Sequence, residues 1–423
     1  MDLKPIIIEQ RQEIEKIDRE ENLIARDKLK DAKKYLLYPN ILVITGIRRC
    51  GKSIFSYLLE RDSKFAYINF DDERLIGLKG NELNKILEAF YELYGEIDYI
   101  ILDEIQNISG WELFVNRLRR TKRVILTGSN SNLLSGELAT HLTGRYIDIK
   151  LFPFSFKEYL LFNQFKFARA YSTEEKSSII NYMKNYLISG GLPESYKFGR
   201  AIVMKIYEDI LNKDILLRHH IKKLEELKGL SKYLITNSSE EITYSKLSKI
   251  LNIKHISTIS NWISYLEESF IIFKLERFNF KFKQQFIAPK KIYCIDTGIV
   301  EVIGFKFSEN KGKVMENCIA IELQRKKWVN PNFEVYYWKN HQQEEVDFVI
   351  KGGNKILELI QSSYVNSREE IKERELKGLI KASKDLKCNS LTIITWDYEG
   401  EILFEDKKIK IIPLWKWMLD SNN

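Results

Sequence analysis

The chain has 423 residues, of which 44% are hydrophobic and 30% charged, and its formal net charge is +8. This length predicts two to four domains, and the modest positive charge does not by itself indicate nucleic-acid binding. Four scattered cysteines without a CxxC pair argue against a disulfide framework or a zinc site. The apolar runs are too short to span a membrane and the start shows no signal-peptide pattern, so we expect a cytoplasmic protein with no membrane partner.

The first segment, from Pro5 to Leu37, has helical periodicity with dense mixed charge and predicts one or two helices. Tyr38, Pro39 and Asn40 interrupt this pattern. The apolar, β-branched run Ile41–Thr45 then predicts a buried strand.

The loop after this strand carries the pattern GxxxxGK[ST]. Glycines allow a tight turn whose backbone N–H groups face an anion, and the helix that opens at Ser53 adds its N-terminal N–H groups. Lys52 is expected to reach the β- and γ-phosphates of ATP, and the Ser53 hydroxyl to bind Mg2+. A chance Gly-rich turn is the alternative, which the complete context of strand, glycines and helix disfavours. The predicted nucleotide contacts are Gly46, Ile47, Arg48, Arg49, Cys50, Gly51, Lys52, Ser53 and Ile54.

The next predicted elements are a strand at 65–70, a helix at 81–94 and an apolar strand at 98–102. The last of these ends in Asp103 and Glu104. We expect Asp103 to hold the magnesium ion through water and Glu104 to orient or deprotonate the attacking water. In isolation, two solvated acids at a strand end would be the simpler interpretation, but the phosphate loop upstream favours the catalytic one.

A helix at 111–120 and a strand at 123–130 follow, and the strand ends in polar residues. In a parallel sheet this end lies beside Asp103, so Ser129 or Asn130 can reach the γ-phosphate or its attacking water. A last strand is predicted at 146–151. Strands alternating with helices predict a doubly wound α/β ATPase domain over residues 1–155.

Nine motifs, taken in order, resemble the prokaryotic and archaeal AAA+ ATPases that carry a C-terminal domain of unknown function related to PD-(D/E)xK nucleases. The resemblance covers nearly the whole chain. It rests on Gly46–Ser53, Asp103–Glu104, Thr127–Asn130, Gly144–Arg145, Pro153–Glu158, Gly190–Glu194, Asp296–Gly298, Glu344–Phe348 and Ile411–Trp415.

Arg145 is a candidate catalytic residue, because in AAA+ rings an arginine of one subunit completes the site of its neighbour. This role implies a nucleotide-dependent homo-oligomer. Arg218 competes for the same role, and a simple pairing of Arg145 with a local acid such as Asp148 is the structural alternative.

Residues 156–223 have helical periodicity, interrupted near Gly190, and predict a helical lid. Residues 224–290 fit a winged helix with helices at 243–251 and 255–266. Ile256, Ile259, Ile263 and Leu266 are expected on the inner face of the second helix, with Ser257, Ser260, Asn261 and Ser264 facing outward toward a DNA groove. Winged helices also dock proteins, so the fold alone does not establish a DNA partner.

The stretch Phe273–Lys283 alternates apolar and basic residues, as expected for the hairpin that forms the wing. Lys274, Arg277, Lys281 and Lys283 would then contact DNA phosphates. A solvated strand face is the alternative.

Residues 291–423 predict a C-terminal α/β domain of the restriction-endonuclease type, with a helix at 313–327, strands at 334–339, 345–350, 355–360 and 391–395, and a helix at 367–387. The nuclease pattern implied by the resemblance needs converging acids and a lysine. Asp347 fits and Glu316 could assist. Counting from Glu358, however, places Ile360 where the lysine belongs, and aligning on Ser362 and Ser363 places Gln361 there. We therefore expect a domain without nuclease activity and leave open whether Asp347 and Glu358 bind metal.

The sequence therefore predicts an ATPase that uses ATP and Mg2+ and acts on DNA through a winged helix and a degenerate nuclease-like domain. A regulatory switch that binds protein partners is the first alternative. An ATP-gated nuclease is the second.

Overall fold

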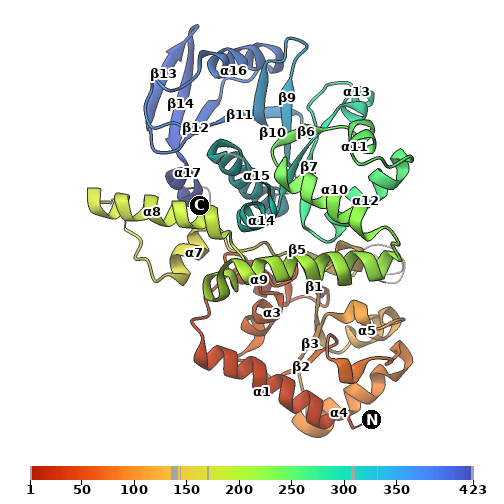
Figure 1. The fold of residues 1–423 in the computed structure, drawn as a ribbon. Coiled ribbons are helices and arrows are strands. Elements are labelled where there is room, and N and C mark those ends of the chain that lie inside the picture. The colour runs from red at the N-terminus through yellow and green to blue at the C-terminus, as the bar shows by residue number, and fades with distance from the viewer. Residues whose placement is uncertain are drawn as a thin grey trace. The chain divides into compact units, whose positions relative to one another are not determined.

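The computed structural model describes residues 2–134, 142, 144–168, 171–305, 310–330 and 332–420 (Figure 1). The chain forms two compact units. One comprises Met1–Phe154, Leu161–Phe165 and Glu268–Phe270, and the other Ser155–Leu160, Lys166–Glu267 and Ile271–Asn423. In the described residues, no helix combines the length and the apolar character that crossing a bilayer would require.

A five-stranded, fully parallel sheet organises the first unit, with strand order β2-β3-β4-β1-β5. The four strands other than the edge strand β5 are almost entirely apolar and buried, as expected when helices cover both faces. The predicted α/β class is thus confirmed for this unit. The strands are β1 (Ile41–Thr45), β2 (Phe65–Asn69), β3 (Tyr99–Asp103), β4 (Arg123–Gly128) and β5 (Tyr146–Lys150).

Five α-helices accompany this sheet in the part of the first unit that the structure describes. The first is amphipathic and buries Ile6, Ile7 and Ile14 while its charged residues face outward. The prediction of one or two helices before β1 is confirmed. The helices are α1 (Lys4–Glu20), α2 (Leu29–Tyr35), α3 (Lys52–Glu60), α4 (Leu83–Tyr94) and α5 (Glu112–Leu118).

The second unit begins with helices, and its predicted interruption near Gly190 is present. Helix α8 ends at Ser189 because the backbone of Gly190 adopts a φ of +73°, outside the helical region. These elements are α7 (Phe156–Phe162), α8 (Thr173–Ser189), α9 (Ser195–Asp209) and the π-helical segment Ile210–Leu217.

Residues 224–294 form a helix, a strand, two helices, a second strand, a short helix and a third strand. The strands make a small antiparallel sheet in the order β6-β8-β7. These elements are α10 (Leu224–Thr236), β6 (Glu240–Ile242), α11 (Tyr244–Ile250), α12 (Ile256–Glu268), β7 (Ile272–Leu275), α13 (Phe282–Ile287) and β8 (Lys290–Cys294).

Two details of this region differ from the prediction. The expected hairpin over 273–283 is wrong, because β7 ends at Leu275 and the chain then pairs with another strand: the N–H of Phe278 donates to Tyr337 O at 2.7 Å. Residues from Phe282 onward form α13 instead. Ile256, expected on the inner face of its helix, is 49% exposed because it lies at the first position of α12.

A six-stranded mixed sheet with order β13-β14-β12-β11-β10-β9 forms the rest of the second unit. Its strands are β9 (Phe333–Lys339), β10 (Glu345–Gly352), β11 (Lys355–Ser363), β12 (Leu391–Thr395), β13 (Gly400–Phe404) and β14 (Lys407–Pro413). The accompanying helices are α14 (Thr297–Ile303), α15 (Lys311–Val329), α16 (Glu373–Leu386) and α17 (Leu414–Asp420).

The helix predicted at 367–387 begins only at Glu373, and the strand predicted at 391–395 is followed by two further strands of the same sheet. Local hydrogen bonds, such as Asn366 N to Glu370 Oε2 at 2.9 Å, hold residues 366–371 in turns before α16. Strands β13 and β14 extend the sheet beyond β12, and they alternate buried with exposed residues as edge-side strands do.

Candidate functional site

Two glycines shape the loop between β1 and α3. Gly51 caps α3 with a φ of +93°, a conformation that L side chains rarely adopt. At Gly46, a Cβ atom would lie only 2.1 Å from the carbonyl oxygen of Leu151. The loop can therefore fold this tightly only with glycine at both positions, and its course leaves the N-terminal N–H groups of α3 available to an anion.

Lys52, at the start of α3, points back into this loop. Its side chain is 4% exposed, its ammonium donates to Ile47 O at 3.2 Å, and it lies 3.5 Å from Glu104 Oε1. Burial alone would lower the pKa of Lys52, but Glu104 and Asp103 outweigh it and raise this pKa. Lys52 is therefore a fixed cation beside the loop.

Asp103, at the end of β3, is fully buried and hydrogen-bonded. The hydroxyl of Tyr67 donates to Asp103 Oδ2 at 2.8 Å, and the hydroxyl of Thr127 donates to Oδ1. Burial and the neighbouring Glu104 raise the pKa of Asp103, while a hydrogen bond with Ser53 opposes this rise. Ser53 and Asp103 thus lie side by side, and their hydroxyl and carboxylate oxygens fit the hard-ligand preference of Mg2+.

Glu104 follows Asp103 with a φ of +53°, an uncommon conformation for a residue with a side chain. Its N–H donates to Thr127 Oγ1 at 3.0 Å, and its Oε2 accepts hydrogen bonds from Gln106 and from Ser129 N. Burial alone would raise the pKa of Glu104, but Lys52 and Arg48 lower it. The group is therefore an ionised carboxylate held in a defined orientation.

Ser129 and Asn130 are each 1% exposed and follow the end of β4. Because β4 pairs with both β1 and β3, their position is at the carboxyl edge of the sheet, beside the loop and Asp103. Ser129 N donates to Glu104 Oε2 at 3.3 Å, so the candidate Asn130, the next residue, lies at the same edge of the sheet as Glu104.

Arg145 lies at the opposite edge of the sheet. Its carbonyl accepts from Ile41 N at 3.0 Å, at the start of β1, whereas the loop follows the end of that strand. A five-residue strand spans roughly 16 Å. The exposed guanidinium contacts Asn116 Oδ1 at 3.3 Å and not Asp148. Within its own chain, Arg145 is therefore not part of the nucleotide site.

The sequence alone did not identify Arg26, whose side chain hydrogen-bonds to the loop backbone. Its guanidinium is 6% exposed and donates to Cys50 O at 3.0 Å and to Phe152 O at 2.7 Å. It also lies 4.9 Å from the ring centre of Phe154. One arginine within a segment of mixed charge gives no local signal, so only the fold reveals this role.

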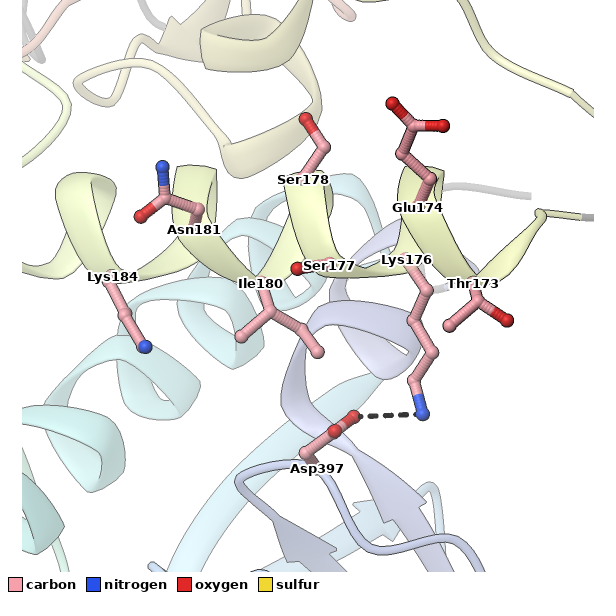
Figure 2. A pocket seen from close by; sticks show the side chains of 9 residues that line it. All are labelled: Thr173, Glu174, Lys176, Ser177, Ser178, Ile180, Asn181, Lys184 and Asp397. Carbon is pink, nitrogen blue, oxygen red and sulfur yellow. Dashed lines mark ion pairs between the residues drawn. The ribbon is translucent and has the colours of Figure 1, made fainter.

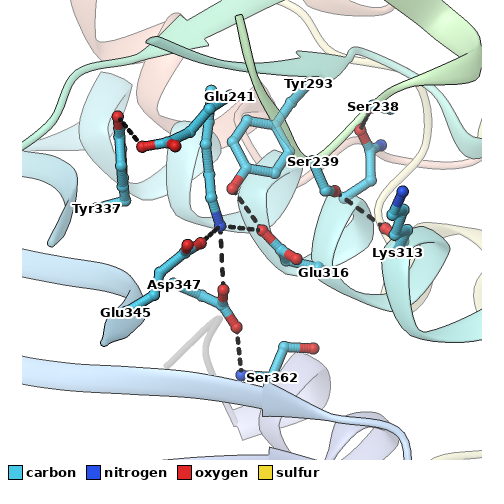
Figure 3. A network of polar contacts seen from close by, with 12 residues as sticks. Ser238, Ser239, Glu241, Tyr293, Lys313, Glu316, Tyr337, Glu345, Asp347 and Ser362 are labelled. Carbon is cyan, nitrogen blue, oxygen red and sulfur yellow. Dashed lines mark hydrogen bonds and ion pairs between the residues drawn. The ribbon is translucent and has the colours of Figure 1, made fainter. Parts of the chain in front are cut away.

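A second polar cluster lies in the other unit and corrects the prediction for the nuclease-like domain (Figure 3). Lys291, on β8, is 2% exposed. Its ammonium lies 2.9 Å from Glu316 Oε1, 2.5 Å from Glu345 Oε1 and 3.1 Å from Asp347 Oδ1. The expectation that this site lacks a positive charge is therefore wrong, because the charge comes from β8, a strand that the nuclease pattern does not include.

The sequence predicted Asp347 and Glu316 for this site but not the side chains that donate hydrogen bonds to them. Tyr293 donates to Glu316 Oε1 at 2.7 Å, and Gln361 Nε2 donates to Asp347 Oδ2 at 2.7 Å. Glu358 does not join them: it pairs in register with Ile350, three residues from Asp347, and therefore lies on the other face of the sheet. It accepts a hydrogen bond from Thr392 instead.

The protonation of the cluster follows from its burial. Burial and the nearby Asp347 raise the pKa of Glu316 to about 7. Burial alone would lower the pKa of Lys291, but the surrounding acids raise it well above its usual value. The lysine ammonium thus lies among three carboxylates and offsets part of their charge.

A groove of about 1000 Å³ runs along α8 in the second unit (Figure 2). Lys176 and Asp397 form an ion pair of 3.3 Å across it, and Ile180 and Lys184 point to the same side of the helix. The groove contains none of the predicted nucleotide or metal residues.

Comparisons with known proteins agree with the nucleotide site. Residues 38–160 match the family described as AAA domain, and residues 180–309 and 311–417 match two domains of unknown function. An uncharacterized protein of Methanocaldococcus jannaschii, MJ1544, is 38% identical over 405 residues, covering 90% of this chain and 89% of that protein. An uncharacterized protein of Haemophilus influenzae is 29% identical over 401 residues, covering 90% and 94%.

Among solved structures, the Walker-type ATPase paby2304 of Pyrococcus abyssi is 16% identical, with a TM-score of 0.43. The similarity covers 66% of this chain and 96% of that one.

Proposed function

This chain belongs to the same protein family as MJ1544 of Methanocaldococcus jannaschii and carries an AAA domain, and from this premise we propose that it is a magnesium-dependent enzyme that binds and hydrolyses ATP. The observation that carries the proposal is the convergence of Lys52, Asp103 and Glu104 at the carboxyl edge of one parallel sheet. Ligands of open α/β sheets bind at this edge.

In the proposed reaction, the N–H groups of the loop and the ammonium of Lys52 hold the phosphates of ATP. Glu104, kept ionised by Lys52 and Arg48, accepts a proton from the attacking water or orients it. Asn130 is placed to position the same water. Magnesium, held through Ser53 and Asp103, would neutralise charge that develops on the phosphate oxygens.

The test is ATP turnover by the purified chain in magnesium, compared with Lys52→Ala. Removing the ammonium should abolish tight ATP binding, because it is the cation nearest the terminal phosphates. Turnover and affinity equal to those of the unsubstituted protein would contradict the assignment.

The partner we propose is DNA, bound through a winged helix formed by residues 224–294. In support, Ser257 and Asn261 are exposed on α12 as the prediction required. Lys274 and Arg277 are less suited to phosphate contact than expected, since Lys274 pairs with Glu267 at 2.6 Å and Arg277 donates to Lys339 O. Lys281 and Lys283 are exposed. ATP turnover that DNA stimulates would support this partner over the protein-binding switch.

For Arg145 we propose a role in a neighbouring subunit, supported by its exposure and its distance from its own site. Mixing an Arg145→Ala variant with a Glu104→Gln variant should then alter turnover through shared sites. Activity independent of protein concentration, in a chain that stays monomeric with ATP, would exclude it.

A further inference from the structure

Four large apolar side chains on and beside α13 are exposed to solvent. Phe280, Phe282 and Phe286 are 77%, 76% and 70% exposed, and Ile287 is 71% exposed. Single exposed apolar residues are common, but a group of neighbouring phenylalanines marks an interaction site.

The charged residues within this segment are both positive. Lys281 and Lys283 alternate with the phenylalanines, both are exposed, and they are the only charged residues between Asn279 and Pro289. Neither has an ion pair among the described residues. The nearest acid in sequence, Glu276, is already engaged by Gln285 Nε2 at 2.7 Å and by Lys290 Nζ at 3.4 Å.

The segment that presents these side chains is anchored. Phe278 is buried, its N–H donates to Tyr337 O, and the ring of Phe280 packs edge-on against it at 5.2 Å. Phe282 and Phe286 are one helical turn apart, with ring centres 6.5 Å from each other. The rings therefore stay exposed on a fixed framework, and their faces are available to a flat ligand.

We propose that this surface, comprising Phe280, Lys281, Phe282, Lys283, Phe286 and Ile287, binds single-stranded nucleic acid by stacking its bases on the phenylalanine rings. This inference rests on the proposed function, in which DNA is the partner, and it specifies that this DNA is single-stranded. Aromatic rings that stack with bases, combined with cations that contact phosphates, are how proteins hold single strands without regard to sequence.

Two other occupants fit less well. A duplex keeps its base faces stacked on one another, so it could use the lysines but not the rings. A membrane surface favours a long amphipathic helix with separate polar and apolar faces, whereas α13 has six residues and its cations alternate with the phenylalanines.

The experiment measures binding of the full chain to a fluorescein-labelled oligothymidylate of about 20 nucleotides by fluorescence polarisation. A double variant, Phe282→Ala with Phe286→Ala, is compared with Phe198→Ala, which removes a phenylalanine that is 63% exposed on α9. The double variant should lose at least about tenfold in affinity, as expected when two bases lose their stacking partners. The control, and the binding of both phenylalanine variants to a duplex of equal length, should change less than about twofold.

The lysines give an independent measurement. Lys281→Glu with Lys283→Glu should reduce the slope of log Kd against log salt concentration by about 1.4, which is two single-strand phosphate contacts at about 0.7 each. Basal ATP turnover without DNA should stay unchanged in every variant.

Failures of the two proposals can be told apart. If DNA stimulates turnover and the chain binds single strands, yet the phenylalanine variant binds them normally, the inference is wrong and the proposed function stands. If the unsubstituted chain binds no nucleic acid and DNA leaves turnover unchanged, both the DNA partner and the inference are wrong. Binding to phosphatidylserine vesicles that is lost in the phenylalanine variant, without oligonucleotide binding, would assign the surface to membranes.

Discussion

Lys52 and Glu104 neutralise each other in the structure, and this pairing has a mechanistic consequence. The same ammonium that lies 3.5 Å from the carboxylate is the group expected to bind the phosphates of ATP. Phosphate oxygens would therefore compete with Glu104 for Lys52. Glu104 would remain anchored by Gln106 and Ser129 while its charge became available to water.

Replacing Glu104 with glutamine should separate binding from hydrolysis. The variant keeps Asp103 and Lys52 and so should bind ATP, but it loses the group that activates water, and turnover should fall by about 10² to 10⁴-fold. Titration with a fluorescent ATP analogue and phosphate release measure the two steps. A variant that loses binding as completely as Lys52→Ala would show that Glu104 holds the nucleotide instead.

The cluster around Lys291 predicts a pH dependence of stability. Glu316 has a pKa of about 7 in the fold against an ordinary value of 4.5, so the folded state binds its proton more tightly than the unfolded state does. The stabilisation from this group is complete below about pH 4.5 and is lost as pH rises toward 7, by on the order of 3 kcal/mol. The protein should therefore lose this contribution between pH 5 and pH 8.

Glu316→Gln removes the titrating group while keeping an acceptor for Tyr293. Denaturant midpoints at pH 5 and pH 8 should differ less in this variant than in the unsubstituted protein. An equal difference in both would assign the pH dependence to other groups.

At the scale of elements, the break between α8 and α9 depends on a contact with the segment after β8. Gly190 has a φ of +73°, and a Cβ atom there would lie 2.0 Å from Asp296 Oδ1. Asp296 is held in place, because its Oδ2 accepts from Gly191 N at 2.6 Å and its Oδ1 accepts from Ile299 N. The side chain therefore cannot move aside without losing these bonds.

Gly190→Ala should accordingly lower Tm far more than a glycine substitution that causes only backbone strain. Gly353→Ala is the matched control, since Gly353 also has a positive φ of +57°, but a Cβ atom there would meet no other atom within 4 Å. We expect about 1–2 kcal/mol from backbone strain in Gly353→Ala. Gly190→Ala should lose more, because its ψ of −162° lies in a region that is essentially restricted to glycine and because its Cβ atom would meet Asp296. Equal Tm values for the two variants would contradict the close contact.

The elements of the first unit could be predicted because their signals are local. Apolar runs such as Ile41–Thr45 identify buried strands, and the glycine pattern before Lys52 fixes where the loop lies. The segment after Leu275 could not be predicted in the same way. Its alternation of apolar and basic residues suits a strand, but pairing of Phe278 with Tyr337, 59 positions away, ends the local sheet.

Lys291 shows the same limit at a site. The nuclease motif predicts a lysine at or next to Gln361 on β11. The lysine that lies beside Asp347 is instead Lys291 on β8, 56 residues earlier in the chain. Only three-dimensional proximity identifies this residue as part of the cluster. Motif spacing finds catalytic groups on one strand pair and misses a group that another strand contributes.

At the scale of the whole molecule, we predict that the chain does not cleave DNA. The ammonium of Lys291 already pairs with Glu345 and Asp347, the carboxylates that would have to hold a metal ion. A metal that stabilises the attacking hydroxide and the charged transition state would therefore have to compete with this ammonium.

The measurement is incubation of linear, branched and single-stranded DNA with the chain in magnesium or manganese, with and without ATP. Asp347→Ala is the control. Cleavage that this substitution removes would refute the prediction and favour an ATP-gated nuclease, whereas cleavage that persists would come from a contaminating nuclease.

The position of Lys291 also bears on how such chains can evolve. The lysine lies in residues 180–309, which match one domain of unknown function, while its acidic partners lie in 311–417, which match another. Replacing residues 180–309 with a segment that has no lysine at this place would leave the buried Asp347 and its two acidic neighbours without their cation, at a cost of several kcal/mol. A chimera between relatives should therefore fold well only when one parent supplies a lysine that matches the acids of the other.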